Sequence, residues 1–183
     1  MSVREQQREK VVMLLAEHLL ETGLTQTSLR QLANAAGVSD RMLLYYFPDK
    51  AAVMAAAIER VAGSLAAALA ELLPENETLP PSALLARIAA MTTREDMRPI
   101  FRVWVEIVAA ARREEPYTTL AANIIAGFRD WVAARLDLPA GAEREATAMA
   151  IIAFVDGLAL VEICCGTRAA ADAAKAVDML LQH

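Results

Sequence analysis

The stretch that decides the fold is Leu29–Pro48, LRQLANAAGVSDRMLLYYFP, which holds two short helical patterns on either side of a glycine. Ala33, in the first pattern, is small enough to let two helices cross closely. Gly37 can adopt the positive φ of a tight turn, and Val38 can fix that turn to an apolar core. These features predict a helix-turn-helix, although an ordinary helical hairpin with a glycine turn fits the same pattern.

The second helix of this motif is predicted to bury one face and present the other. Ser39 can cap its start, and Pro48 ends it. Leu43 and Tyr46 lie three residues apart, so we expect both to face inward. The residues that remain for the outer face are Asp40, Arg41, Leu44 and Tyr45.

Helical patterns flank the motif on both sides. Residues Val3–Thr22 carry an apolar stripe at helical spacing and predict a first helix. The next helix is expected to start after Thr27, whose hydroxyl can cap free backbone N–H groups. A long helix is predicted over Lys50–Leu73, with Asp49 as its cap.

The segment Pro74–Pro81 contains three prolines and reads as a linker. Beyond it, helical spacing predicts five segments, which are Ser82–Met91, Arg94–Glu114, Tyr117–Leu136, Ala142–Cys165 and Arg168–Leu181. The expected fold is all-α with about nine helices. It comprises a helix-turn-helix domain over residues 1–50, a connecting helix over 50–73 and a helical domain over 74–183.

The composition limits the class of protein. Hydrophobic residues make up 56% of the 183-residue chain, and the many alanines and leucines favour helices. A membrane-spanning helix needs about 20 apolar residues, and Asp156 and Glu162 interrupt the most apolar region, so we expect a cytoplasmic protein without membrane contact. The two cysteines, Cys164 and Cys165, and the two histidines lack metal-ligand spacing. No nucleotide-binding or catalytic motif occurs, so neither a metal, a cofactor nor an enzyme is expected.

Residues Arg8–Val61 resemble the N-terminal domain of the TetR family of transcriptional regulators. The resemblance is carried by GVS at positions 37–39, then six residues, YF at 46–47, two further residues and Lys50. It covers about a third of the chain and implies a helix-turn-helix over residues 28–47 that binds double-stranded DNA. Two positions depart from the family. Arg41 stands where glycine is common, and Leu44 stands where a tyrosine commonly meets a phosphate.

The resemblance also implies which residues contact DNA. The second helix of such a motif lies in the major groove, where Arg41 could donate to O6 and N7 of guanine. Arg41 could instead stay solvated or pair with Asp40, and Met42 could touch a thymine methyl group or join the core. The implied contact residues are Thr27, Ser28, Arg30, Ser39, Asp40, Arg41, Met42, Tyr45 and Lys50.

The net charge of the chain is unusual for a DNA-binding protein, because DNA-binding surfaces are normally basic. The net charge is −5. Up to residue 50 the basic residues, Arg4, Arg8, Lys10, Arg30, Arg41 and Lys50, are balanced by Glu5, Glu9, Glu17, Glu21, Asp40 and Asp49. DNA binding would therefore depend on where a few cations lie.

For the rest of the chain the resemblance implies a homodimer through residues 142–165 and 168–181 and a small-molecule effector of unknown identity. Small residues such as Ala153 and bulky ones such as Ile152, Leu160, Val177 and Leu181 fit a four-helix dimer bundle, or equally an intramolecular core. The implied pocket residues, which could also be plain core, are Met91, Phe101, Trp104, Ile107, Phe128, Trp131, Phe154 and Asp156. Asp156 and Glu162 could be pocket acids or could pair with Arg102, Arg129 or Arg168.

Taken together, the expected function is that of a ligand-responsive transcriptional regulator. Repression, the commoner role in the family, would act on a near-palindromic operator bound by the homodimer. The neutral N-terminal region and Leu44 support an alternative, a helical ligand- or partner-binding protein that no longer reads DNA.

Overall fold

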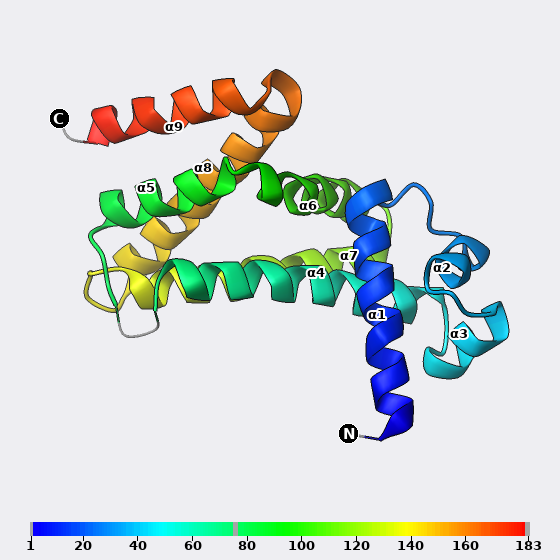
Figure 1. Ribbon diagram of the computed structural model, residues 1–183. Coiled ribbons are helices and arrows are strands. Elements are labelled where there is room, and N and C mark those ends of the chain that lie inside the picture. The colour runs from blue at the N-terminus through cyan, green and yellow to red at the C-terminus, as the bar shows by residue number, and fades with distance from the viewer. Residues whose placement is uncertain (1, 75–76, 182–183) are drawn as a thin grey trace. The chain divides into compact units, whose positions relative to one another are not determined.

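The computed structural model describes residues 2–74 and 77–181, with side chains up to residue 176. Within these ranges every regular element is helical, which confirms the predicted all-α class (Figure 1). The elements are α1 (Val3–Thr22), α2 (Leu29–Ala35), α3 (Asp40–Tyr46), α4 (Lys50–Leu72), α5 (Pro81–Thr92), the 3-10 turn η1 (Glu95–Met97), α6 (Arg98–Ala111), α7 (Glu115–Arg135), α8 (Ala142–Cys165) and α9 (Thr167–Leu181).

Side-chain caps explain where the N-terminal helices begin. The Ser39 hydroxyl accepts a hydrogen bond from the Met42 backbone N–H at 3.2 Å, and the Asp49 carboxylate accepts one from Ala52 at 2.8 Å, both as expected. The predicted cap of α2 is wrong by one residue. Ser28 caps that helix by accepting from the Gln31 N–H, whereas the buried Thr27 hydroxyl donates to the Leu24 carbonyl.

One predicted helix is divided in the structure. Residues 94–114 were expected to form a single helix, but the 3-10 turn η1 precedes α6, which starts at Arg98. Pro99 gives the physical reason, because a proline lacks the N–H of a helix interior and is tolerated in the first turn. Helix α6 also ends three residues before its predicted end at Glu114, and the other helix ends fall within about two residues of the predictions, which is the usual uncertainty of helix boundaries.

The chain forms two compact units. The first contains the residues up to 67 together with 103–121, and the second contains 68–102 together with the residues from 122 onward. Helices α4, α6 and α7 each contribute residues to both units. These compact units do not test whether the chain on either side of residue 74 folds independently. The predicted domain boundary there therefore stays a prediction.

In the first unit, α1, α2 and α3 pack around a small apolar core with the start of α4. Leu15, Leu19, Leu32, Leu43 and Val53 have no exposed surface. Ala33 is also fully buried, as the close crossing of α2 and α3 requires. Gly37 has φ +66°, a conformation that side chains other than glycine adopt at a cost, so the predicted turn is confirmed.

In the second unit, α8 packs against α5 and α9. Its buried face contains Ala148, Ile152 and Val155, which meet a core that includes Leu84 and Ile88 of α5. The predicted linker is partly held in this unit. The Leu79 N–H donates to the Arg135 carbonyl at 2.9 Å, and the Leu79 carbonyl accepts from Asp137 at 2.8 Å.

By length and composition alone, α4 and α8 are apolar enough to cross a membrane, contrary to the expectation that charged residues exclude every such segment. In α8 the apolar stretch that follows Glu145 contains only two charges, Asp156 and Glu162. About a third of the apolar window in α4 (33%) and somewhat more in α8 (39%) is buried. A core helix passes the same test, so this is weak evidence for a membrane segment.

Candidate nucleic-acid interface

Helix α3 presents a mixed surface of cationic, apolar and hydroxyl groups. Arg41 and Asp40 are exposed, Met42 and Leu44 are each 43% exposed, and Tyr45 is 59% exposed. The alternative that places Met42 in the core is therefore wrong. A short helix that exposes large apolar side chains beside an arginine has the composition of a surface that contacts a partner, because apolar groups can pack on thymine methyls while arginine reads guanine.

The opposite side of α3 is firmly held. Leu43 is completely buried and Phe47 is 2% exposed, so two apolar anchors fix the helix to the core. Tyr46 is half-buried, and its hydroxyl donates to the Gln7 side-chain oxygen of α1 at 3.0 Å. This bond joins α3 to the N-terminal half of α1 and fixes the angle at which the outer face is presented.

The starts of α2 and α4 lie within the same unit. Ser28 and Arg30 are exposed at the start of α2, and the Ser28 hydroxyl is engaged with the Gln31 side chain at 2.6 Å. Lys50 is exposed as the first residue of α4. Of the nine predicted contact residues only Thr27 is buried, at 8% exposure. Its occupied hydroxyl makes it a structural residue of the turn, and we leave it out of the contacts proposed below.

Two arginines that the sequence reasoning did not single out lie beside α3. The Arg4 guanidinium carbon is 4.8 Å from the centre of the Tyr45 ring, and that of Arg8 is 4.8 Å from the centre of the Phe47 ring. Residues four apart share a helix face, and Val12 and Leu15 continue this face into the core. This shared face is the sequence feature that could have identified the two arginines, because a cation at the end of an apolar stripe still faces the neighbouring helix.

The cations of this region are free to bind an external anion. Among the residues that the structure describes, no ion pair involves Arg4, Arg8, Arg30, Arg41 or Lys50. Two acids are occupied with backbone groups instead, since Glu5 accepts from the Ser2 N–H at 2.7 Å and Asp49 caps α4. The charges up to residue 50 cancel in number, but Glu5 and Asp49 are engaged by backbone N–H groups, whereas these five cations form no ion pair with any described residue.

A small pocket of about 270 Å³ lies between the start of α4 and the start of α7, both within the first unit. Apolar side chains such as Met54, Ile58 and Leu120 line it, with Lys50 and Glu114 among the polar members. Burial raises the pKa of the half-buried Tyr117 phenol, and the charge of Glu114 adds to this effect. No pattern in the sequence predicts this pocket, because its two walls are distant in the chain.

The residues predicted to bind an effector are divided between the two units. Trp104 and Ile107 belong to the first, and the remaining six belong to the second. Met91, Phe101 and Ile107 are buried, whereas the others are half-buried. Their role stays a prediction.

Trp131 is the most distinctive of these residues. Its indole Nε1–H is buried and has no hydrogen-bond acceptor within the described part of the chain. The ring lies 6.3 Å from that of Phe128, and the Arg135 guanidinium lies 4.2 Å from the centre of the Trp131 ring. A buried donor without an acceptor costs about 1–3 kcal/mol, so an acceptor brought by a ligand would be stabilised here.

Glu162 has a partner that the sequence reasoning did not consider. Its carboxylate is 7% exposed and accepts from Arg98 Nε at 2.5 Å, and it also accepts from the Thr167 hydroxyl at 3.1 Å. The predicted pairings with Arg102, Arg129 or Arg168 are therefore wrong for Glu162. The cluster ties the start of α6 to the junction of α8 and α9, so its geometry indicates a structural role.

One face of α8 remains apolar and exposed. Met149 is 43%, Leu160 48% and Ile163 43% exposed, and Ala146, Ala150 and Ala153 are small exposed residues of the same helix. Ile152, expected to supply bulk to a dimer interface, is buried in the core of the second unit, so that expectation is wrong. Val177 and Leu181 lie outside the side chains that the structure describes.

Comparisons with known proteins agree with this architecture. Residues 15–57 match the family described as bacterial regulatory proteins, tetR family, and residues 80–183 match the family described as BetI-type transcriptional repressor, C-terminal. The HTH-type transcriptional regulator PksA of Bacillus subtilis (strain 168) is 29% identical over 189 residues, which cover 98% of this chain and 88% of that protein.

Solved structures share the fold over nearly the whole chain. A putative TetR-family transcriptional regulator from Rhodococcus sp. superposes with a TM-score of 0.76 at 20% identity, covering 96% of this chain and 98% of the other. The multidrug binding protein EbrR, solved with proflavin, gives a TM-score of 0.68 at 22% identity, covering 96% and 99%. One family match spans more than half of the chain and another spans the helix-turn-helix. The chain therefore belongs to the TetR family of transcriptional regulators.

Proposed function

We propose that this regulator is a ligand-responsive repressor that binds a near-palindromic operator as a homodimer. The observation that carries the proposal is the outer face of α3, on a helix anchored by Leu43 and Phe47. Arg41 is exposed there and pairs with no acid among the residues that the structure describes. A rigidly held arginine can donate two hydrogen bonds to guanine, and such a pair discriminates by about 1–3 kcal/mol. We therefore assign recognition of the DNA base sequence to Arg41.

The other contacts are assigned to positioning on the DNA backbone. Ser28 and Arg30 stand at the start of α2, and Lys50 stands at the start of α4, where a helix N-terminus also favours an anion. Ser39, Asp40, Met42 and Tyr45 complete the proposed interface on α3. Phosphate contacts of this kind hold the reading helix in register but are not sequence-specific.

The experiment that tests this proposal measures the affinity of purified protein for selected and random DNA at several salt concentrations. Arg41→Ala should reduce discrimination between the two DNAs more than it reduces random binding, whereas Lys50→Ala should weaken both about equally. Wild-type protein that retains no DNA at about 50 mM salt would instead favour a helical ligand- or partner-binding protein, because non-specific phosphate contacts persist there.

Dimerisation is proposed through α8 and α9. Helix α8, about 36 Å long by its residue count, exposes a row of apolar side chains that a second copy would cover. A dimer is also needed energetically, because each N-terminal unit offers few cations and two linked contacts bind far more tightly than one.

A matched pair of variants tests this interface. Leu160→Glu places a charge on the exposed face of α8, and Val108→Glu places one at a comparably exposed apolar position of α6. Light scattering after size-exclusion chromatography should show a monomer for Leu160→Glu and a dimer for wild type and Val108→Glu. A dimeric Leu160→Glu protein, or a monomeric wild type, would contradict the assignment.

For the effector we propose a mostly apolar molecule that carries a hydrogen-bond acceptor for the Trp131 indole. Proflavin is a suitable probe of the apolar part of such a site, because EbrR, which shares the fold, was solved with it. Its ring nitrogen is protonated at neutral pH and donates, so the Trp131 contact is tested with an uncharged aromatic compound that carries a carbonyl acceptor. Bound effector should weaken operator binding, with a coupling of about 1–3 kcal/mol between the two sites. Proflavin that binds equally well with and without operator would argue against this coupling. Trp131→Phe, which keeps an aromatic ring and removes the donor, tests the contact.

A further inference from the structure

We infer that the first turn of α1 belongs to the DNA-binding surface, and that Arg4, stacked on Tyr45, binds a phosphate of the DNA backbone next to the base pairs that α3 contacts. The inference rests on the proposed function, because it needs α3 to lie against DNA. It adds a contact outside the helix-turn-helix, made by a residue of α1.

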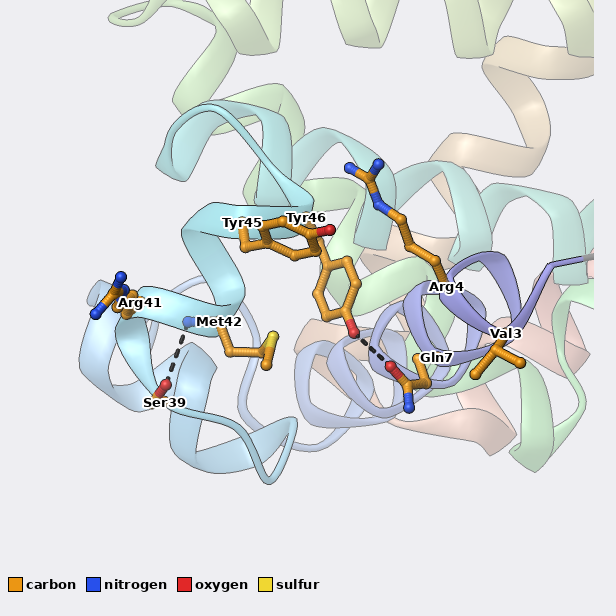
Figure 2. Close-up of a pocket in the computed structure, with 8 residues that line it drawn as sticks. All are labelled: Val3, Arg4, Gln7, Ser39, Arg41, Met42, Tyr45 and Tyr46. Carbon is orange, nitrogen blue, oxygen red and sulfur yellow. Dashed lines mark hydrogen bonds between the residues drawn. The ribbon is translucent and has the colours of Figure 1, made fainter.

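Arg4 and Tyr45 line a common groove between α1 and α3. The groove has a volume of about 530 Å³, and Val3, Gln7, Ser39, Arg41, Met42 and Tyr46 complete its lining. Figure 2 shows Arg4 beside the tyrosines at one end of the groove and Arg41 at the other end. The hydrogen bond from Tyr46 to Gln7 joins the two walls, one turn along α1 from Arg4.

The stacking leaves the binding groups of Arg4 available. The Arg4 guanidinium carbon lies 4.8 Å from the centre of the Tyr45 ring, and its N–H donors form no hydrogen bond or ion pair within the described residues, so they can donate to a phosphate. Because the ring also restricts the rotamers of this long side chain, less conformational entropy is lost when the phosphate binds. The exposed Tyr45 phenol adds a hydroxyl donor at the same end of the groove.

The charge of the groove favours an anion of extended shape. Its lining residues include two arginines and no acid, and neither arginine takes part in an ion pair within the described residues. Arginine binds phosphate through two parallel hydrogen bonds. Since Arg41 belongs both to this groove and to the proposed reading face, a DNA strand in contact with Arg41 continues toward Arg4. The DNA backbone is therefore the occupant to which we commit.

The test compares Arg4→Ala with Arg60→Ala. The second variant removes an equal, exposed charge ten residues after the start of α4, and this charge forms no ion pair within the described part of the chain. Affinity for selected and random DNA is measured by fluorescence anisotropy over a range of salt concentrations. The logarithm of the DNA association constant falls with the logarithm of the salt concentration, and each lost phosphate contact makes this slope less steep by about 0.9. In a dimer that loses two contacts, the slope changes by about twice that value. We expect this change for Arg4→Ala on both DNAs, with an unaltered ratio between them, and none for Arg60→Ala.

Variants of Tyr45 show whether the stacked pair acts as a unit. Tyr45→Ala should make the salt dependence of DNA binding less steep, because it removes the ring that supports Arg4. The double variant, Arg4→Ala with Tyr45→Ala, should change this slope by less than the sum of the two single changes. Circular dichroism and thermal melting confirm that each variant is folded.

Three results would overturn the inference while the wild type binds DNA. The first is a salt-dependence slope for Arg4→Ala equal to that of the wild type. The second is a change of slope for Arg60→Ala as large as that for Arg4→Ala. The third is a change of slope in the double variant equal to the sum of the two single changes. If the wild type shows no salt-dependent binding at all, the proposed function itself fails, so the two failures can be told apart.

Discussion

Gly23 and Gly37 have nearly the same positive φ, +67° and +66°, yet alanine should affect them very differently. Gly23 ends α1 with ψ −157°, a combination of angles that is essentially restricted to glycine. A Cβ atom there would come within 2.8 Å of the carboxyl carbon of Glu106. Nothing lies within 4 Å of a Cβ atom at Gly37.

The magnitude of the Gly23→Ala effect has two sources. The backbone conformation costs an alanine about 1–3 kcal/mol. The Glu106 carboxylate accepts a hydrogen bond from the Leu24 backbone N–H at 2.5 Å, and an intruding Cβ atom would displace it, with a loss of about 1.5–3 kcal/mol for a hydrogen bond to a charged group. Because Glu106 is half-buried, we expect the lower part of the combined range, about 3–4 kcal/mol. Gly37→Ala meets only the backbone cost, about 1–2 kcal/mol.

Urea unfolding at one fixed protein concentration measures both values, since self-association would otherwise shift the midpoint. The decisive comparison uses a second background. In Glu106→Ala protein the carboxylate is already absent, so Gly23→Ala should then cost only its backbone part. A Gly23→Ala effect that does not exceed that of Gly37→Ala, or one that is unchanged in the Glu106→Ala background, would show that Glu106 does not contribute to the cost.

Three further changes have outcomes that the structure specifies. Leu43→Ala, at a completely buried position of α3, should destabilise the protein by about 2–5 kcal/mol and lower the melting temperature measured by circular dichroism. Arg98→Ala should cost about 1–3 kcal/mol in urea unfolding, because the buried Glu162 carboxylate loses its cation, whereas Arg168→Ala, at an exposed position, should cost almost nothing. The raised pKa of Tyr117 means that the folded state favours the neutral phenol; this stabilisation is present below about pH 10, the ordinary pKa of tyrosine, and is lost as the pH rises through the folded-state pKa. Stability above pH 10 should therefore fall less steeply in Tyr117→Phe, and an identical pH dependence would contradict this expectation.

The features that could be predicted from the sequence depend on residues close together in the chain. Ser39, Gly37 and Leu43 fix the cap, the turn and the buried face of the helix-turn-helix within seven residues, and all three predictions are confirmed. The bounds of α8 were also predicted correctly, because a glycine stands on each side of a long apolar helix former. Local chemistry was sufficient in these cases.

The features that were missed join distant residues. The Leu24 amide and the Glu106 carboxylate are 82 positions apart, and Tyr46 and Gln7 are 39 apart. Neither pair shares a periodic pattern, so their meeting follows only from the packing of whole helices. Glu162 illustrates the same limit, since three arginines were named and the actual partner is Arg98, which lies one turn before Arg102 on α6.

The neutral charge of the N-terminal region shows why a count of charges is a poor guide to binding. Opposite charges cancel at long range, but within about a Debye length, near 10 Å, a partner experiences the individual groups that face it. Here Glu5 and Asp49 are engaged by backbone amides, while Arg4, Arg8 and Arg41 lie on or beside α3 with no acid paired to them. With so few cations per copy, the affinity of one N-terminal unit for DNA should be low and strongly salt-dependent. In the proposed homodimer, tight binding comes from two copies acting together, so a change that separates the two copies should abolish binding to the proposed operator even where every DNA-contacting residue is intact.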